Sequence, residues 1–521
     1  MAKLPLLPIG VQDFAQLRES QKLYVDKTAY LRQMIEEGNF YFLARPMRFG
    51  KSLTVSTLEA MFAGRVELFS GLAAEEWVRG QQVKPSPIFH LDLSAWSASQ
   101  SADSLNEWLL RRVRNKARDY GVTLEEAALS AEAFSEATEA IAKKMGRVVV
   151  LIDEYDAPVL RNIENLQKVE QIRELLRDFY AVVKSISGCI RFLLLTGIST
   201  FCKMGVFSSL NNVEDISMDA RYGAVCGYTM AELQHYFSVF IDGDLTQFEV
   251  KSKGELLDRI RQYYDGYSFD GETRVYNPFS VLNFFKKCSF KNYWYESGEP
   301  TFLDAYLRNH GISHPEIYSG YPVSNNFTAV SDIEKASPES FLYQAGYLTV
   351  LEKEESGYVL DYPNQEVRAS IADLFQSCVY KVSDYITLGK RLWQALCEEN
   401  LEEVLHCYNT ELAAIPYHDL KKTSEGFYRA LFLVMLRAVG ITVYAEIPTK
   451  NGRSDLVVET PSALYVLEFK LAQDKSSVDA KRVEGEKQIA DKNYGVPFGN
   501  DSRTMHACVI VIDASAHVAY L

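Results

Sequence analysis

The segment R-P-M-R-F-G-K-S, from Arg45 to Ser52, could bind the phosphate groups of a nucleotide. It joins an apolar run to a stretch with a helical apolar pattern, and the free N–H groups at a helix N-terminus suit an anion. Gly50 allows a close approach of the backbone, Lys51 can reach the β- and γ-phosphates, and the Ser52 hydroxyl can bind Mg²⁺. Because the general pattern G-x-x-x-x-G-K-[ST] has glycine at the position of Arg45, these residues alone are a weak indication of a phosphate-binding loop.

About a hundred residues downstream, the apolar run VVVLI ends in Asp153 and Glu154. A carboxylate at the carboxyl end of a central strand can hold Mg²⁺, and a second one beside it can orient the attacking water. We assign the first role to Asp153 and the second, catalytic role to Glu154. The alternative is that both merely cap a strand with solvated charge. Thr196, at the end of the run RFLLLTG, is either a sensor of the γ-phosphate or an ordinary threonine at a strand end.

A second group of charged residues lies near the C-terminus. Asp455 begins one predicted strand, and Glu468 and Lys470 end the next. Two carboxylates at adjacent strand ends can bind Mg²⁺ through oxygen ligands. Lys470 points to the same face as Glu468, where an ammonium group could position or help deprotonate a metal-bound water. This is the chemistry that phosphodiester hydrolysis requires.

Three further residues could assist this second group: Glu425 in the preceding helix, and Gln488 and Lys492 in the following one. We expect each of them to be a solvated helix residue rather than a catalytic one. The basic cluster Arg111–Arg118 could follow a phosphate backbone, although a solvated helix face is the stronger interpretation.

The elements that must position the first group alternate between short apolar strands and helices. The sequence predicts strands over 39–45, 87–94, 147–155 and 191–197, with helices over 103–120, 131–144 and 169–185 between them. This alternation predicts a parallel α/β sheet with right-handed crossovers. After Gly227 the segments are helical and aromatic-rich, with no strand run of comparable strength, so we expect a mostly helical middle domain. The last hundred residues follow the order α-β-β-β-α-β, a compact α/β domain.

Several segments, in the same order, closely resemble the bacterial AAA-ATPase-like family that carries a C-terminal PD-(D/E)XK nuclease-superfamily domain. They include RPMRFGKSLT, LIDEYDAPV, GYTMAEL, YYDGYSF, YNPFSVLNFF and NYWYESGEPTFL, and the resemblance covers nearly the whole chain. The family's own phosphate loop resembles R-P-x-R-F-G-K-S, so Arg45 is an expected departure from the general pattern. Asp455, Glu468 and Lys470 match the D…E-x-K pattern of the superfamily, whose alternative here is a nuclease fold that only binds a nucleic acid or a protein.

The resemblance implies a full set of site residues and domains. The nucleotide would contact Arg45, Arg48, Phe49, Gly50, Lys51, Ser52, Leu53, Asp153 and Thr196, and Mg²⁺ would bind Ser52 and Asp153 in the first site and Asp455 and Glu468 in the second. Asp26 and Lys27 would lie near the nucleotide or have structural roles. The implied domains are an AAA-like phosphate-loop NTPase over 1–226, a mostly helical lid or middle domain over 227–365, a helical connector over 366–419 and an α/β restriction-endonuclease-like domain of the PD-(D/E)XK type over 420–521.

Composition limits the possible partners and compartment. The net charge of −14 excludes an overall electrostatic attraction to nucleic acid or to an anionic membrane, so any contact with DNA or RNA must use a local basic groove. The eight cysteines are scattered without a C-x-x-C pair, which argues against a thiolate metal site and a disulfide framework and favours a reducing cytoplasm. No apolar run approaches the roughly 18 residues of a membrane span.

These observations lead to one main functional hypothesis: an ATPase, with ATP and Mg²⁺ as cofactors, that regulates a C-terminal Mg²⁺-dependent nuclease acting on DNA or RNA. The alternative is a nucleotide-switched interaction or signalling protein whose nuclease-like domain only binds a partner. A small-molecule kinase is a weaker interpretation because no acceptor motif is present. Phosphate-loop ATPases often complete their site with an arginine from a neighbour, so a homo-oligomer is plausible.

Overall fold

The computed structural model describes most of the chain. The described residues are 4–80, 85–97, 101–124, 129–163, 165–200, 212–296, 320–329, 336–375, 385–414, 424–437, 441, 443–445, 448–449, 452–492, 503–513 and 518–520. The chain forms two compact units, the first comprising 1–306 and 318–366 and the second comprising 307–317 and 367–521. The finer division into four domains stays a prediction.

The first unit is built on a five-stranded parallel sheet with the order β2-β3-β4-β1-β5. Its strands are β1 (Phe40–Ala44), β2 (Ile88–Asp92), β3 (Val148–Asp153), β4 (Ile190–Gly197) and β5 (Glu214–Asp215). All six residues of β3 are buried, as a continuous apolar run requires when both faces of a parallel sheet are covered. The predicted parallel α/β sheet is therefore confirmed.

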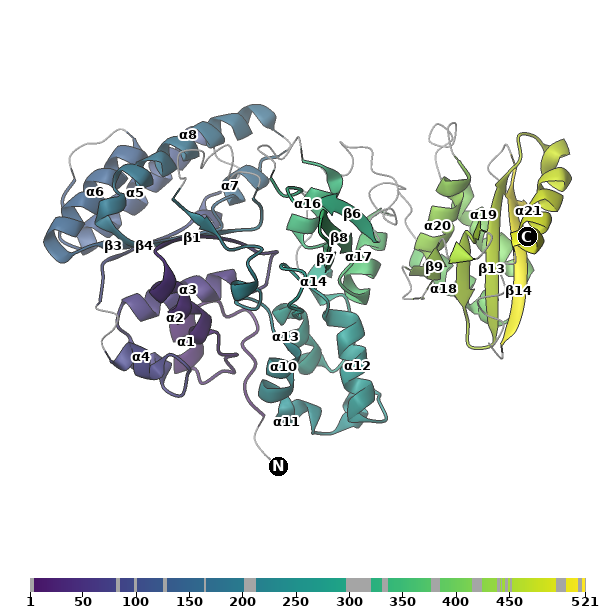
Figure 1. Cartoon of the computed structure of the whole chain (residues 1–521), viewed down its shortest axis with the longest axis horizontal. Helices are drawn as coiled ribbons and strands as arrows, with labels where there is room; N and C mark the ends of the chain where they lie inside the picture. The colour runs from purple at the N-terminus through teal and green to yellow at the C-terminus, as the bar shows by residue number, and fades with distance from the viewer. Residues whose placement is uncertain are drawn as a thin grey trace. The chain divides into compact units, whose positions relative to one another are not determined.

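Helices cover both faces of this sheet (Figure 1). On one face lie α5 (Ala102–Asp119), α6 (Ser130–Met145) and α8 (Leu166–Ser185), whose apolar stripes share a core with β3 and β4. On the other lie α1 (Phe14–Glu19), α2 (Thr28–Glu37), α3 (Lys51–Phe62) and α4 (Glu75–Arg79). The basic cluster Arg111–Arg118 belongs to α5, whose buried side includes Leu109 and Val113.

After the sheet, the first unit continues as the predicted helical region. It contains α10 (Met230–Tyr236), α11 (Ser238–Ile241), α12 (Lys253–Tyr264), α13 (Pro278–Lys287), α14 (Tyr293–Glu296) and α16 (Pro338–Ala345). Phe237, Tyr264 and Phe284 are among the aromatic side chains that form its core. The helical middle is confirmed.

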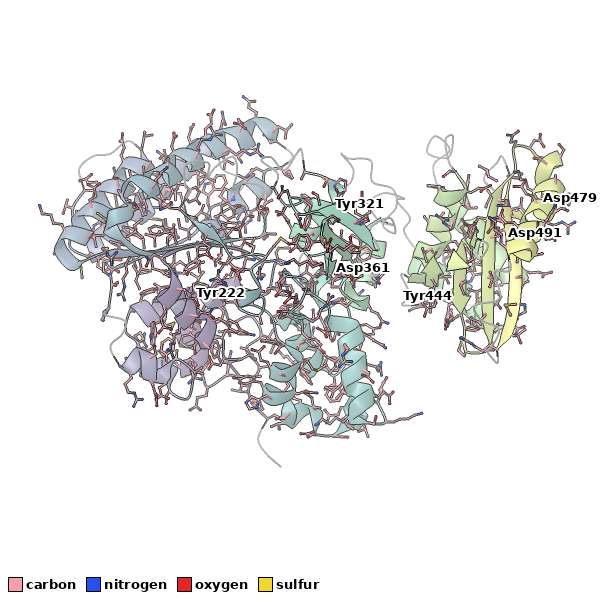
Figure 2. All side chains as sticks on the ribbon, viewed as in Figure 1. Tyr222, Tyr321, Asp361, Tyr444, Asp479 and Asp491 are labelled. Carbon is pink, nitrogen blue, oxygen red and sulfur yellow. The ribbon has the colours of Figure 1, made fainter. Side chains whose placement is uncertain are left out.

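The sequence interpretation missed a small antiparallel sheet in this middle region. Its strands β6 (Tyr321–Ser324), β7 (Thr349–Lys353) and β8 (Gly357–Asp361) pair in the order β6-β8-β7. In Figure 2, Tyr321 and Asp361 mark two of these strands. The strands are only four or five residues long and mostly half-exposed, so none of them forms the continuous apolar run that identified the parallel strands.

The second unit carries a five-stranded mixed sheet with the order β15-β14-β13-β12-β9. Its strands are β9 (Val443–Ala445), β12 (Leu456–Glu459), β13 (Ala463–Leu471), β14 (Thr504–Ile512) and β15 (Val518–Tyr520), and a short hairpin joins β10 (Pro448–Thr449) to β11 (Gly452–Arg453). Its described helices are most of α17 (Gln365–Phe375), α18 (Tyr385–Cys397), α19 (Leu401–Ala414), α20 (Glu425–Arg437) and α21 (Val478–Lys492). Because β13 and β14 are parallel, α21 is their crossover. The predicted α/β fold is confirmed, with β15 and the hairpin as additions.

No helix within the described residues is both long enough and apolar enough to cross a membrane.

Candidate functional sites

Three strand ends meet at one edge of the parallel sheet and carry the first group of predicted residues. β1 leads into the loop 45–50, β3 ends in Asp153, and β4 runs between them with Thr196 near its end. The register pairs Leu43 with Thr196 and Ala44 with Gly197. The carboxyl ends of parallel strands lie on the same side of a sheet, so the loop, the acidic pair and Thr196 converge there.

The ammonium group of Lys51 lies inside the phosphate-binding loop. Gly50 has a φ of 98°, in the left-handed region that favours glycine, and α3 begins directly after it. Lys51 is only 3% exposed. Its Nζ donates to the carbonyl oxygens of Arg45 at 3.0 Å and Pro46 at 3.2 Å, and forms an ion pair with Glu154 at 3.2 Å. Ser52 follows in the first turn of α3 and is partly exposed, as is Leu53.

The acidic pair at the end of β3 is held in two different ways. Asp153 is almost fully buried, and its Oδ1 accepts hydrogen bonds from the Thr196 hydroxyl and from the Glu154 N–H. Glu154 has a positive φ of 50°, an uncommon conformation that often occurs at functional sites. Burial raises the pKa of Glu154, and the charge of Lys51 partly offsets this shift. A raised pKa suits a carboxylate that accepts a proton.

Side chains elsewhere in the loop pack into the protein. Arg45 is 1% exposed and donates to the carbonyl oxygens of Ala44 at 2.9 Å, Ser217 at 2.6 Å and Tyr222 at 3.1 Å. Tyr222 lies inside the first unit beside the sheet (Figure 2). Phe49 is 1% exposed and contacts aromatic rings of the middle region. The predicted nucleotide contacts of Arg45 and Phe49 therefore depend on their backbone groups.

Asp26 and Lys27 have structural contacts. Asp26 accepts hydrogen bonds from Thr28 and from the Ala73 N–H, and so joins the start of α2 to the segment before α4. Lys27 donates to both carboxylate oxygens of Glu232 at 2.6 Å. Lys27 also lines a small, mainly apolar cavity beside Gly50 and the first turn of α3.

The second site lies where β12 and β13 of the second unit meet. The pairing of Leu456 with Leu467 places Asp455 opposite Glu468 at the end of the ladder. Glu468 is 2% exposed, and its Oε1 accepts a hydrogen bond from the Lys470 ammonium group at 2.8 Å. The predicted triad of Asp455, Glu468 and Lys470 therefore shares one sheet end.

The helices on either side add three residues to this site. Gln488 on α21 donates to Glu468 Oε1 and accepts from Lys470 at 3.0 Å. Glu425 on α20 accepts from the Leu471 N–H at 3.1 Å. Arg429, also on α20, donates to Asp455 Oδ1 at 3.0 Å. Gln488 and Glu425 are thus part of the site, not the solvated residues that we expected.

Lys492 lies one turn beyond Gln488 on α21 and adds positive charge near Glu468. In Figure 2, Asp491 marks this end of the helix.

Arg429 was not singled out from the sequence. The signal that could have identified it is its position four residues after Glu425, because residues i and i+4 share one face of a helix.

The charges of the second site partly neutralise each other. Burial raises the pKa of Glu468, although the hydrogen bond from Lys470 opposes this shift. The hydrogen bond and charge of Glu468 raise the pKa of Lys470 against the effect of burial. Glu468 Oε2 is buried and has no hydrogen-bond partner among the described residues. An unpaired buried carboxylate oxygen is costly, so it fits a cation that the protein binds.

The small number of carboxylates in the second site suits Mg²⁺, which does not need a site made entirely of protein ligands. Within the described part of the chain, no group of three or more His, Cys, Asp or Glu residues is arranged as a metal site. Mg²⁺ is usually bound by one or two carboxylates and completes its shell with waters and substrate phosphates. Asp455 and Glu468 supply that number of ligands.

Comparisons with known proteins match both parts of the chain. The family described as "Predicted AAA-ATPase" matches residues 8–207, and the "PD-(D/E)XK nuclease superfamily" matches 423–519. A relative from Azotobacter chroococcum mcd 1, "Uncharacterized protein in vnfD 5'region", is 33% identical over 526 residues, which cover 97% of this chain and 98% of the relative. The chain belongs to the AAA-ATPase-like family with a C-terminal PD-(D/E)XK domain.

One solved structure, the Aeropyrum pernix ORC1 protein in complex with DNA, is 12% identical with a TM-score of 0.25, over 68% of this chain and 94% of that one. This likeness is too weak to support an argument. Membership of the AAA-ATPase-like family is consistent with ATP and Mg²⁺ as cofactors, which such ATPases and nucleases generally use.

The first prediction concerns Arg45, the residue at which this loop departs from the general phosphate-loop pattern. Arg45→Gly restores the general phosphate-loop pattern, yet we expect it to lower the free energy of unfolding by about 2–4 kcal/mol, because three carbonyl oxygens lose their donor and a buried space is left. Thermal and denaturant unfolding of the first unit would measure this loss.

Arg48→Gly is the matched control. Arg48 lies in the same loop at a φ of 68°, with its guanidinium over the Phe279 ring at 4.2 Å. Glycine relieves the backbone strain there while the cation–π contact is lost, so we expect a change below about 1 kcal/mol. Equal stability of Arg45→Gly and the native protein would contradict the structural role of Arg45.

Proposed function

We propose that this protein is an ATPase whose nucleotide state regulates a Mg²⁺-dependent nuclease acting on DNA or RNA. The ATPase is supported by the convergence of Lys51, Glu154 and Asp153 at the strand ends of the parallel sheet. The observation that carries the nuclease is the unpaired Oε2 of Glu468, opposite Asp455 and beside Lys470. A homo-oligomer that completes the ATPase site with a neighbour's arginine is part of this proposal.

The residues of the first site have complementary roles in ATP hydrolysis. Lys51, now paired with Glu154 and two loop carbonyls, would turn to the β- and γ-phosphates. Glu154 is then released to orient the attacking water and accept its proton. Thr196 fixes the Asp153 carboxylate, and Ser52 and Asp153 would hold Mg²⁺, which neutralises phosphate charge.

In the second site, Asp455 and Glu468 would hold Mg²⁺, which supplies charge stabilisation for the scissile phosphate. Glu468 and Gln488 fix the Lys470 ammonium group from two sides. A fixed ammonium group can position a water molecule for attack on phosphorus. Glu425 holds the end of β13 through the Leu471 N–H, and so keeps the strand that carries Glu468 and Lys470 in place.

A chain of direct contacts connects the phosphate loop to the end of the first unit. Trp294 Nε1 donates to the Met47 carbonyl at 3.2 Å, and the Trp294 N–H donates to Glu366 at 2.8 Å. Ser280 Oγ donates to the other Glu366 oxygen at 2.7 Å. Glu366 is fully buried and is the last residue of the first unit. The helix α17 (Gln365–Phe375) begins there and runs on into the second unit.

These contacts support nucleotide control of the nuclease. A ligand that moves Met47 changes the hydrogen bond to Trp294, and Trp294 shares the Glu366 carboxylate with Ser280. Glu366 lies in the first turn of α17, so the contacts of its carboxylate hold the start of that helix. We propose that ATP binding acts through this route.

A nucleotide-switched interaction protein remains the second candidate. The observation in its favour is that the two carboxylates predicted to bind the metal are already paired, Asp455 with Arg429 and Glu468 with Lys470. Such pairs would also stabilise a nuclease fold that only binds a partner. The nuclease experiment below distinguishes the two functions.

The second prediction tests the ATPase. Glu154→Gln removes the carboxylate that would accept the proton, so we expect ATP to bind while the hydrolysis rate falls by about 10²–10⁴-fold. Lys51→Ala should lose nucleotide binding. Phosphate release and nucleotide titration measure both effects, and Glu132→Gln, an exposed substitution on α6, is the control. Native turnover by Glu154→Gln would exclude the assigned role.

The third prediction tests the nuclease. We expect the native chain to cleave labelled DNA or RNA with Mg²⁺ and to lose this activity in EDTA. Asp455→Ala, Glu468→Ala and Lys470→Ala should each lower the rate by about 10²-fold or more. Asp479→Asn, an exposed position on α21, should leave it unchanged. Identical products from the native chain and these alanine variants would favour the interaction protein.

The fourth prediction tests the coupling route. Glu366→Gln keeps the size of the side chain but removes its charge, so we expect ATP hydrolysis and basal cleavage to persist while the effect of ATP on cleavage falls several-fold. Cleavage rates with and without ATP measure this effect. Glu355→Gln, at an exposed turn of the same unit, is the control. An unchanged ATP effect in Glu366→Gln would refute the route.

A further inference from the structure

Arg429 is a cation of the second site that the proposed nuclease chemistry does not use. It lies on α20 four residues after Glu425, so both side chains share the helix face that borders the site. Glu425 accepts from the backbone N–H of Leu471, while Arg429 Nη1 donates to Asp455 Oδ1 at 3.0 Å. The second oxygen of Asp455 accepts from the Phe469 N–H at 2.8 Å.

The two ion pairs of the site differ in their access to solvent. The side chains of Lys470 and Glu468 are 6% and 2% exposed, whereas those of Arg429 and Asp455 are 25% and 22% exposed. The Lys470–Glu468 pair is therefore shielded from solvent, whereas the Arg429–Asp455 pair is exposed enough for a nucleic acid to reach it. A guanidinium group at this place stays charged at any physiological pH.

A cation at Asp455 and Glu468 would compete with Arg429 for the same carboxylate. Mg²⁺ needs an oxygen of Asp455, and the guanidinium group holds Oδ1 in its absence. The guanidinium could then bind an anionic group of a substrate that the same cation contacts, such as the scissile phosphate. Planar guanidinium groups bind phosphate and carboxylate with the same paired N–H geometry, so one can exchange for the other.

We propose that Arg429 is a substrate-positioning residue, which pairs with Asp455 in the resting site and with a non-bridging phosphate oxygen of bound DNA or RNA once a divalent cation occupies the carboxylates. This inference rests on the proposed nuclease function and assigns the outer side of its site to phosphate binding. The resting ion pair keeps Asp455 satisfied before the cation and substrate arrive.

If Arg429 had only a structural role, its removal would change the affinity for the cation in the opposite direction. If Arg429 only oriented Asp455 as a metal ligand, its removal would weaken cation binding. If it competes with the cation, its removal strengthens cation binding and weakens the hold on nucleic acid. The sign of the change in metal affinity therefore separates the two roles.

The experiment uses the full chain without nucleotide and titrates Mn²⁺ by calorimetry, with Asp455→Ala as the baseline for binding elsewhere. We expect Arg429→Met to bind Mn²⁺ about threefold to tenfold more tightly than the native protein. In Mg²⁺, its KM for the nucleic acid should rise about tenfold, with a smaller change in kcat. Arg429→Lys keeps the charge without the paired geometry and should restore part of the substrate affinity.

Salt dependence gives a readout that a structural role would not change. In a Lys470→Ala background, which prevents cleavage, adding Arg429→Met should reduce the slope of log affinity for DNA against log salt by about one, because one phosphate contact is lost. Weaker Mn²⁺ binding by Arg429→Met, or an unchanged KM and salt slope, would overturn the inference. A native chain that shows no Asp455-dependent Mn²⁺ binding and no cleavage would instead refute the proposed nuclease.

Discussion

Lys51 carries a positive charge into the interior of the first unit, and a buried charge is costly unless it is paired and hydrogen-bonded. Two loop carbonyls and Glu154 meet this requirement. The carbonyls belong to residues that follow β1, and the carboxylate follows β3, so the pairing requires the two strands to end at the same level. The strand order places β4 between them and brings Thr196 against Asp153. Residues of three neighbouring strand ends therefore satisfy one another within the site.

The same constraint governs the second unit. Lys470 is paired with Glu468, and Arg429 with Asp455. Removing one partner of the buried Lys470–Glu468 pair would leave an uncompensated charge, so this pair holds its neighbours in place. Both sites thus rest in a state where cationic side chains occupy carboxylates that would bind Mg²⁺ or act on water. In each site a ligand must replace protein contacts whose charge has the same sign as its own, so binding depends on the charge and geometry of the ligand.

The sequence was sufficient where a feature depends on local pattern. VVVLID and RFLLLTG predicted central parallel strands because burial on both faces leaves no alternation, and the spacing of Asp455 and Glu468 predicted adjacent strand ends. It was insufficient where the direction of a side chain depends on tertiary packing. Gln488 and Glu425 looked like solvated helix residues because nothing local shows that their helices border β13. The short strands β6 to β8 lacked an apolar run because most of their residues are partly or fully exposed.

The residues at the variable positions of the general phosphate-loop pattern pack the loop against the middle region. Met47 accepts from Trp294, Arg48 stacks on Phe279, and Phe49 packs against Tyr267 and Phe269. Three successive residues of the loop therefore contact the middle region, Met47 through its backbone carbonyl and Arg48 and Phe49 through their side chains. A glycine in place of Arg48 or Phe49 would lose that side-chain contact. Because of these contacts, a movement of the phosphate loop on nucleotide binding would also move α13, through Phe279, and α14, through Trp294.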